Sequence, residues 1–583
     1  MANFYTDNED IQFLFRHMDL ARLAALAEDG FRFAKEFDFA PADAAEAVDN
    51  YHRILCTIGE IACERVAPTA AETDTVGNVL NPDGSVTYAP GMAEAIRLLS
   101  QAGVMGFSLP YRFGGINCPN LLYTMSNDIV SRADASLMNL YGLQGIAETI
   151  NQFACEEIKR EYLPRLASGE YTGAMVLTEP DAGSDLQAVK TRAYQDAGGN
   201  WFVRGVKRFI TNGCGHVLLV LARTEPEIAD GRGLSCLLVE SGPRVRVRRL
   251  EHKLGINGSP TCELFFDDAP AKLIGDRQRG LITYVMSLMN GARVGIAAQS
   301  LGIGEAAYRV ARDYAHSRKQ FNNAIENFPA VRDLLVDMSL DLQAARALTY
   351  YASFSVDLEL RLTDRLESKA VTDENEIKRL RAEARKYKGY NKVLTPMAKY
   401  YASEMSMRVS NSAMAVLGGS GYMRDYPVER NLRDARITTI YEGTSQLQVV
   451  AAISGVMSGL VAEIAGEILA GSAGSAECAS LVASIQQGLG VLGQSAAFIK
   501  ARPDSNTYRD LYARKLVDMA IDLLVGALFC DHARTNPKKL LAARRWLSDR
   551  MPQVRMLQEQ IRSGDTLSLT AFETLAPPVP VGD

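Results

Sequence analysis

One carboxylate in the stretch TTIYEGTSQLQ (residues 438–448) has the setting of a reactive group. Glu442 stands between Tyr441 and Gly443, just past a segment rich in arginine and aspartate. Most glutamates of globular proteins are solvated surface groups. A buried glutamate is a stronger base, because the loss of water disfavours its charged form and raises its pKa toward neutrality. The stretch alone fits both interpretations, so the other motifs must decide between them.

Two motifs upstream could meet a phosphorylated or planar ligand. LTEPDAGSDLQA (residues 177–188) combines small and hydroxyl residues in a turn, which leaves N–H and O–H groups available to a phosphate. A plain hairpin loop explains this stretch equally well. GVKRFITNG (residues 205–213) places Phe209 and Thr211 near a predicted strand end, where they could pack against and hydrogen-bond a planar cofactor. Taken alone, an ordinary strand is the simpler interpretation.

A third motif, LGGSGYMRDYPVER (residues 417–430), is rich in glycine. It follows a helical pattern and lacks the G-x-G-x-x-G spacing, so it is not a Rossmann turn. Gly418, Gly419 and Gly421 would let a ligand approach the backbone closely. A helix C-cap accounts for one or two of these glycines but hardly for all three.

A fourth motif, HSRKQF (residues 316–321), places Arg318 and Lys319 at a predicted helix end. Basic residues are usual at helix ends because they complement the helix dipole. The alternative, functional interpretation is that they pair with a phosphate of a ligand. Each motif is weak by itself. Their order along the chain carries more weight than any one of them.

The composition is that of a globular protein, and its net charge does not indicate a nucleic acid or membrane partner. The 583 residues exceed one core, so two to four domains are expected. A net charge of −6 gives no overall attraction to nucleic acid or anionic membranes. Nine scattered cysteines and six histidines lack ligand spacing, which predicts free thiols in the cytoplasm and no metal site. We expect neither a secretory signal nor a membrane span, and MAIDLLVGALFC (residues 519–530) reads as a buried helix.

The elements that must position these motifs follow the order helix, strand, helix. Apolar residues repeat at three- and four-residue steps through residues 1–173. Short β-prone runs between turn residues fill residues 174–275 and predict an antiparallel barrel or sandwich. Helical patterns return from residue 276, with the charged segment 363–389 expected as an exposed connection with helical ends. Further helices follow residue 455, so the predicted fold class is α+β multidomain.

Taken in order, five stretches resemble the acyl-CoA dehydrogenase family. They are LTEPDAGSD, GVKRFITNG, KLGINGSPTCELFFDD, ARVGIAAQSLGIGEAAYRVARDYAHSRKQF and LGGSGYMRDYPVERNLRDARITTIYEGTSQLQ, and the likeness covers roughly residues 50–455. The resemblance implies a domain order that agrees with the helix, strand, helix reading. These domains are an N-terminal helical domain (1–173, with about 1–45 an extension), a middle antiparallel β-domain (174–275), a C-terminal four-helix bundle (276–455) and a helical extension (456–583).

The resemblance also implies the reaction. An acyl-CoA thioester would lose its α proton to a carboxylate base and its β hydride to N5 of FAD, giving a trans-2-enoyl-CoA as in fatty acid β-oxidation. An electron-transfer flavoprotein would then take the electrons. By resemblance Glu442 is the base. Some members carry the base on an earlier helix, but this chain has no acidic residue between Leu288 and Gly295.

Other roles carry over from the family residue by residue. The implied FAD contacts are Thr178, Ser184, Phe209, Thr211, Gly418, Gly419, Thr444 and Gln446, with Arg318, Gln320 and Phe321 reaching FAD across a subunit interface. Arg293 would order the region of the base and CoA. Family members commonly have Trp at the position of Phe209, and Gln at the positions of Pro329 and Ala415. The last two departures concern the adenosine side of FAD.

With its long C-terminal tail, the chain resembles the C-terminally extended subgroup of the family. This subgroup includes the very-long-chain members and the enzymes that act on 3-methylmercaptopropionyl-CoA. In that subgroup the tail tends to replace the second dimer of a tetramer, so a homodimer is expected. Two alternatives stay open, namely an acyl-CoA oxidase of the same fold and a non-catalytic CoA-binding scaffold. The acyl group is open as well, because Tyr141 could shorten the substrate pocket or be a packed core tyrosine.

Overall fold

The computed structural model describes residues 2–368, 371–470 and 478–579. The chain forms two compact units. Unit 1 contains the described residues up to Asn391 together with Ala398–Ser445, and unit 2 contains Lys392–Met397 and the described residues from Gln446 onward.

Unit 1 starts with helices, as predicted for the N-terminal domain. They are α1 (Glu9–His17), α2 (Leu20–Ala27), α3 (Ala44–Ile61), α4 (Ala70–Val76), α5 (Pro90–Gln101), α6 (Asn120–Ala133), α7 (Ala135–Gly142), α8 (Ile146–Phe153) and α9 (Glu156–Ser168), with a small hairpin of β1 (Val79–Leu80) and β2 (Val86–Thr87). α1 begins where it does because the Asn8 side chain accepts hydrogen bonds from two N–H groups of the first turn. α6 is buried along most of its length and packs against α10 and α11 of the C-terminal domain.

The middle domain is a barrel-like sheet, as predicted. Its strands are β3 (Gly173–Val176), β4 (Arg192–Gln195), β5 (Trp201–Thr211), β6 (Val217–Arg223), β7 (Leu234–Glu240), β8 (Val245–Leu250) and β9 (Thr261–Ile274). Six of them pair in the order β3-β6-β4-β5-β9-β7, β8 pairs with β9, and a further β6–β7 pairing closes the sheet on itself. Most pairings are antiparallel, but β6 pairs in parallel with both β3 and β4, which the predicted antiparallel arrangement did not include.

Alternation along β6 divides its side chains between two cores. Leu218 and Val220 belong to the cluster inside the barrel. Val217 and Leu219 belong to a second cluster, which includes Leu163 of α9. Successive strand residues point to opposite faces, so a strand buried on both faces joins the barrel to the helices beside it.

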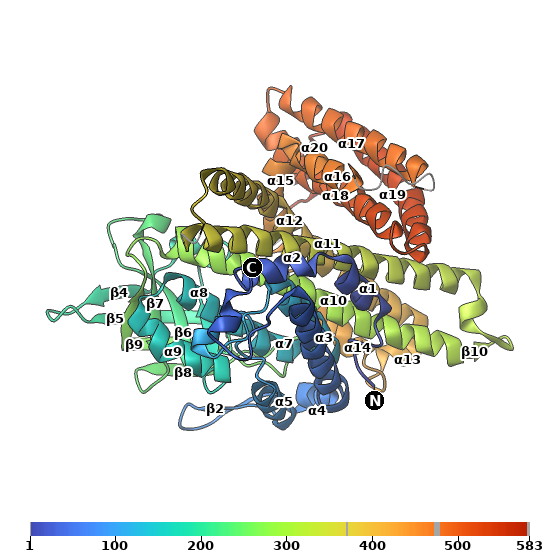
Figure 1. Ribbon diagram of the computed structural model, residues 1–583. Helices are drawn as coiled ribbons and strands as arrows, with labels where there is room; N and C mark the ends of the chain where they lie inside the picture. The colour runs from blue at the N-terminus through green and yellow to red at the C-terminus, as the bar shows by residue number, and fades with distance from the viewer. Residues whose placement is uncertain (1, 369–370, 471–477, 580–583) are drawn as a thin grey trace. The chain divides into compact units, whose positions relative to one another are not determined.

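The C-terminal domain of unit 1 is helical, also as predicted. It contains α10 (Met286–Ser317), a hairpin of β10 (Lys319–Gln320) and β11 (Asn323–Ala324), α11 (Pro329–Glu367), α12 (Glu374–Leu417), α13 (Gly419–Tyr422) and α14 (Val428–Thr438). The long helices α10 and α11 run side by side (Figure 1). The segment 363–389 is more helical than expected, because α11 continues to Glu367 and Asp373 caps the start of α12.

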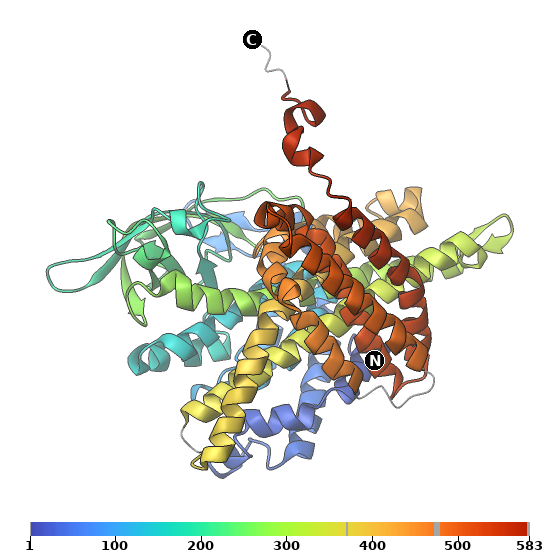
Figure 2. The ribbon, with the colours of Figure 1, turned by 90° about the horizontal axis from the view of Figure 1, so that it is seen from above.

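Unit 2 is built from α15 (Ser445–Ser458), α16 (Leu460–Ala470), α17 (Ala479–Lys500), α18 (Ser505–Ala533), α19 (Lys538–Arg562), α20 (Leu567–Thr570) and α21 (Phe572–Leu575). α18 is the core helix and packs against α16, α17 and α19. Residues 519–530 of α18 are all buried, which confirms the predicted buried helix. The C-terminal segment after α19 extends away from the helices of this unit (Figure 2).

Within the described ranges, no single helix has both the length and the apolar composition needed to cross a membrane. Only the bent pair of α15 and α16, which turn by 73° at their junction, meets these two criteria when the helices are taken together.

Candidate active site

Glu442 lies on a strained turn that follows α14. Its φ is +54° and that of Gly443 is +87°, so two successive residues adopt the left-handed region. A residue with a Cβ rarely takes this conformation, and the strain is of the order of 1–3 kcal/mol. Gly443 takes it freely, which explains a glycine at this place. Such outliers persist where the surrounding structure holds them and often mark functional sites.

The surroundings of Glu442 raise the pKa of its carboxyl group. Burial raises the pKa of Glu442 to about 7, against the opposing effects of Lys399 and Arg293. Burial in turn lowers the pKa of Lys399 to about 7 and lowers that of Arg293, while the Glu442 charge opposes both shifts. A carboxylate with a pKa near the working pH suits proton abstraction. Glu442 is half-buried and its pKa is raised, so the interpretation as a plain, fully solvated surface carboxylate does not fit this environment.

Tyr441, beside the candidate base, is anchored by a buried polar network. Its hydroxyl donates to Oε1 of Gln299 on α10 and lies 3.2 Å from Oδ1 of Asn139 on α7. The Gln299 amide donates to the same Asn139 oxygen at 2.8 Å. The sequence did not predict these three residues, or Lys399, as site residues. The contacts among Tyr441, Gln299 and Asn139 join segments that lie more than 100 residues apart, and Lys399 contacts the end of another helix.

Three of the predicted flavin contacts gather at one edge of the barrel. The Arg208 N–H donates to the Thr178 carbonyl at 2.9 Å, which brings the loop after β3 beside Phe209. Phe209 interrupts the register of β5 with β9, has a φ of +62° and leaves 53% of its side chain exposed. Thr211 is half-buried two residues further on. An irregular strand that turns a large ring out to solvent fits a place where a planar ligand stacks.

A buried ion pair holds the loop that carries Thr178. The Lys207 side chain is completely buried, donates to the Leu177 carbonyl at 2.7 Å and pairs with Glu179 at 2.9 Å. Glu179 also accepts from the N–H groups of Lys190 and Thr191. Both residues lie inside the sequence motifs described above, but nothing in the local sequence shows that they pair.

The residues predicted to reach FAD across a subunit interface lie on the β10–β11 hairpin and just before it. Arg318, Gln320 and Phe321 are exposed, and 91% of the Phe321 side chain is accessible. Phe321 and Asn322 have φ values of +49° and +61°, as a two-residue hairpin turn of type I′ requires. The hairpin and the barrel lie at opposite ends of unit 1 in both views (Figures 1 and 2). One chain therefore does not bring this group to the barrel edge.

The glycine pair forms an open patch of backbone. Gly418 and Gly419 have no atom within 4 Å of the position where a Cβ would stand. The Tyr314 hydroxyl contacts Ser420 at 3.3 Å, so the pair lies beside the last turns of α10. Space that a side chain would fill is left clear there, as close approach of a ligand requires.

The remaining predicted residues have varied positions. Ser184 is exposed on its loop, Thr444 is half-buried on the turn of Glu442, and Gln446 is exposed in the first turn of α15. Tyr141 is 1% exposed, and its hydroxyl bonds with Ser126 at 3.1 Å. This position matches the alternative of a packed core tyrosine.

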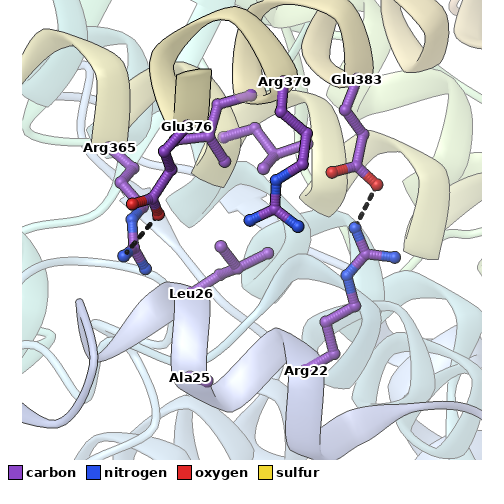
Figure 3. Close-up of a pocket in the computed structure, with 9 residues that line it drawn as sticks. Arg22, Ala25, Leu26, Arg365, Glu376, Arg379 and Glu383 are labelled. Carbon is purple, nitrogen blue, oxygen red and sulfur yellow. Dashed lines mark hydrogen bonds and ion pairs between the residues drawn. The ribbon is translucent and has the colours of Figure 1, made fainter. Parts of the chain in front are cut away.

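A cavity of about 410 Å³ lies elsewhere in unit 1, between α2 and the helices α11 and α12 (Figure 3). Arg22 pairs with Glu383 and Arg365 pairs with Glu376 across it, and Arg379 also lines it. None of the predicted site residues is among its lining residues. The chemistry is therefore not placed in this cavity.

Comparison with known proteins identifies the class. The chain matches the N-terminal domain of acyl-CoA dehydrogenases over residues 49–170, the middle domain over 174–269 and the C-terminal domain over 279–367 and 376–455. It is 36% identical to an acyl-CoA dehydrogenase of Bacillus subtilis, over 61% of this chain and 87% of the relative. It is also 36% identical to an acryloyl-CoA reductase (NADH) of Anaerotignum propionicum, over 63% and 86%.

Solved structures agree with this assignment. A chain in the structure of the electron transferring flavoprotein of Acidaminococcus fermentans is 30% identical, with a TM-score of 0.59 over 70% of this chain and 98% of that one. The acyl-CoA dehydrogenase of Bacillus anthracis, solved with FAD, shares the fold over 91% of this chain and 92% of its own, with a TM-score of 0.75 at 22% identity. This protein belongs to the acyl-CoA dehydrogenase family. It is an acyl-CoA dehydrogenase, a flavoprotein oxidoreductase with FAD as its cofactor.

The site residues of this chain fit FAD. The exposed ring of Phe209 offers a stacking surface, and the open backbone at Gly418 and Gly419 leaves room for a diphosphate. Ser184 and Arg318, both exposed, add a hydroxyl and a positive charge of the kind that phosphates bind.

Replacing Gly418 with alanine is expected to lower both stability and FAD retention. Gly418 has φ +60° and ψ −136°, a region that residues with a Cβ avoid at a cost of about 1–3 kcal/mol. Thermal unfolding and the ratio of flavin to protein absorbance after gel filtration measure the two effects. Gly466→Ala is the matched control, because Gly466 lies inside α16 and also has open space around it. An unchanged melting temperature in Gly418→Ala would contradict the argument.

Proposed function

We propose that Glu442 removes the α proton of an acyl-CoA thioester in this enzyme and that a trans-2-enoyl-CoA is formed. The observation that carries the proposal is the pKa of Glu442, raised by burial to about 7 on a strained turn beside two cations. The α C–H of a thioester is a weak acid, so an ordinary solvated carboxylate is too weak a base for it.

Different residues of this chain abstract the proton, position the base and bind the ligands. Glu442 takes the α proton onto its carboxylate, and Tyr441 is fixed through Gln299 and Asn139 beside it. Arg293 stands close enough to Glu442 to affect its charge and would help order the CoA thioester. FAD would supply the acceptor for the β hydride, held by Phe209, Thr178 and Ser184 of one chain and by the glycine pair of a second copy, because that pair lies at the hairpin end of unit 1 (Figure 1).

Activity is expected to fall as the pH drops through about 7. Only the deprotonated form of Glu442 accepts a proton, and its pKa is raised to about 7, so the active fraction is lost below that pH. The measurement is kcat/KM against pH, which reports the base of the free enzyme. An acidic limb near pH 4, where an ordinary glutamate titrates, would show that Glu442 is solvated and is not the base.

For the electron acceptor we propose an electron-transfer flavoprotein. The likeness to a chain in the Acidaminococcus fermentans flavoprotein structure supports this partner. Substrate should reduce the enzyme anaerobically, and the reduced form should persist for minutes when air is admitted. Rapid reoxidation with formation of peroxide would instead identify an acyl-CoA oxidase of the same fold.

We further propose a homodimer of the C-terminally extended subgroup. The hairpin of Arg318, Gln320 and Phe321 lies at the far end of unit 1 from the barrel, so its predicted contact with FAD needs a second copy (Figures 1 and 2). The additional helices of unit 2 support the subgroup. Light scattering should give twice the chain mass of 63.7 kDa, and a tetramer would contradict the proposal.

The acyl group is left open between straight-chain, aryl, thioether and dicarboxylic substrates. Steady-state assays over a panel of CoA thioesters decide between them. A second candidate is the reverse reaction, because a relative at 36% identity is an acryloyl-CoA reductase that uses NADH. Oxidation of NADH on addition of an enoyl-CoA would favour that direction.

For the cellular location we propose the cytoplasm. All nine cysteines are free thiols, as expected in a reducing compartment. Cell fractionation with activity assays checks this location.

A further inference from the structure

Lys399 connects α12 to the turn that carries Glu442. Its side chain is completely buried. Its Nζ donates to the carbonyl of Thr438 at 2.7 Å and to the carbonyl of Gly443 at 2.8 Å. These two carbonyls lie on either side of Glu442 in the chain, so one side chain holds both ends of the segment that bears the base.

The segment between these carbonyls needs such support. Thr438 ends α14, and the last carbonyls of a helix have no partner within the helix. A cation at that end also complements the helix dipole. Glu442 and Gly443 then take left-handed backbone conformations, which the local sequence does not favour for a glutamate. The bond from Lys399 to Gly443 fixes this turn immediately after the base.

Charge gives Lys399 a second effect on Glu442. The charged groups that act on Lys399 are Glu442, Glu404 and Arg293, and those that act on Glu442 are Lys399 and Arg293. The positive charges favour the carboxylate form of Glu442, whereas burial disfavours it. Without Lys399, only Arg293 would oppose burial, and more of Glu442 would be protonated at neutral pH.

We infer that Lys399 is a positioning residue of the dehydrogenation, which fixes the turn of Glu442 through the Thr438 and Gly443 carbonyls and keeps the base ionised. The inference rests on the proposed role of Glu442. It assigns Lys399 no contact with substrate or cofactor. Its effect is expected in the rate and pH dependence of proton abstraction.

The test compares three variants of the full-length holoenzyme. Lys399→Met removes the hydrogen bonds and the charge, Lys399→Gln keeps an N–H donor without the charge, and Lys399→Arg keeps the charge. Lys392→Met is the matched control, because Lys392 lies on the same helix but is exposed. Each protein is measured for FAD content, melting temperature and kcat/KM across pH with one acyl-CoA substrate.

For Lys399→Met we expect bound FAD, a kcat lower by about 10- to 100-fold, and an acidic limb moved to higher pH by roughly one unit. Lys399→Gln should shift the limb in the same direction, whereas Lys399→Arg should leave it near the wild-type position. The control should behave as wild type throughout. A normal acidic limb in both neutral variants, or loss of FAD in all three Lys399 variants, would overturn the inference.

Glu442→Gln is measured in parallel to separate this inference from the proposed function. If that variant turns over normally, the proposed base is wrong, whatever the Lys399 variants do. If it is inactive while Lys399→Met keeps both the wild-type kcat and the wild-type pH profile, the base is right and the role of Lys399 is wrong.

Discussion

Glu442→Gln is expected to bind FAD and acyl-CoA but to lose dehydrogenation by about 10²- to 10⁴-fold in kcat. Glutamine keeps the size of the side chain and an oxygen, but it does not accept a proton at neutral pH. The half-buried turn and its left-handed backbone are otherwise unchanged, so binding should persist. Stopped-flow reduction of the enzyme by substrate measures the chemical step directly.

Asp425→Asn serves as the control for this experiment. Asp425 is an exposed acid 17 residues before Glu442 in the same motif region, so its neutralisation should leave turnover unchanged. Substrate binding to Glu442→Gln is checked separately by the perturbation of the flavin spectrum. Normal reduction by substrate in Glu442→Gln would remove Glu442 from the mechanism, and equal losses in both variants would point to a general charge effect.

Arg346→Met is expected to destabilise the fold by about 3–5 kcal/mol, the usual effect of removing one partner from a buried ion pair. The Arg346 side chain is 1% exposed, and three carboxylates surround it. It contacts Asp10 of α1 at 2.8 Å, Asp128 of α6 at 2.9 Å and Glu305 of α10 at 2.9 Å. Methionine keeps the volume but leaves the buried carboxylates of Asp128 and Glu305 and the half-buried carboxylate of Asp10 without their shared cation.

The effect of this change should depend on pH. Burial would raise the pKa of Glu305, but Arg346 and then Arg309 hold it below its ordinary value. In Arg346→Met the carboxylates would have raised pKa values in the folded state, so protonation favours folding. The loss of unfolding free energy in Arg346→Met, relative to the wild type, should therefore be larger at pH 8 than at pH 5.

Urea unfolding of the wild type and of Arg346→Met at pH 5 and pH 8 measures this difference in stability. Limited proteolysis adds a local readout, because Asp10 ties the N-terminal extension to α11, and cleavage within residues 1–45 should accelerate. Arg381→Met, an exposed arginine on α12, is the control and should change neither quantity. If Arg346→Met is as stable as the wild type, the prediction is wrong, and the ion pairs of Arg346 with its three carboxylates make no net contribution to stability.

The sequence was sufficient for the class of protein and for the domain order. Hydrophobic periods of 3.6 and 2 residues distinguish helical from strand segments, because those periods set which side chains face a core. The helix, strand, helix order is confirmed, and so is the buried helix at residues 519–530. The parallel pairings of β6 were not predicted, since strand partners far apart in the chain leave no mark on local alternation.

The candidate site divides in the same way. Glu442, Phe209 and the glycine pair stand in short motifs, and the order of these motifs along the chain carries the resemblance that identifies them. The buried partners Lys399 and Gln299 could not be found in this way, because they bind groups that lie 39 and 142 residues away in the chain. A buried charge has meaning only with the groups that surround it.

By itself, then, the sequence determined which carboxylate is the candidate base and which cofactor class it serves. The tertiary structure decided the rest, namely that burial raises the pKa of Glu442, that Lys399 and Arg293 act on its charge and that its turn is held from α12. The physical reason is that burial and electrostatic coupling arise only when distant segments pack together. A pKa near 7 is a property of that packing and not of a glutamate in a chain.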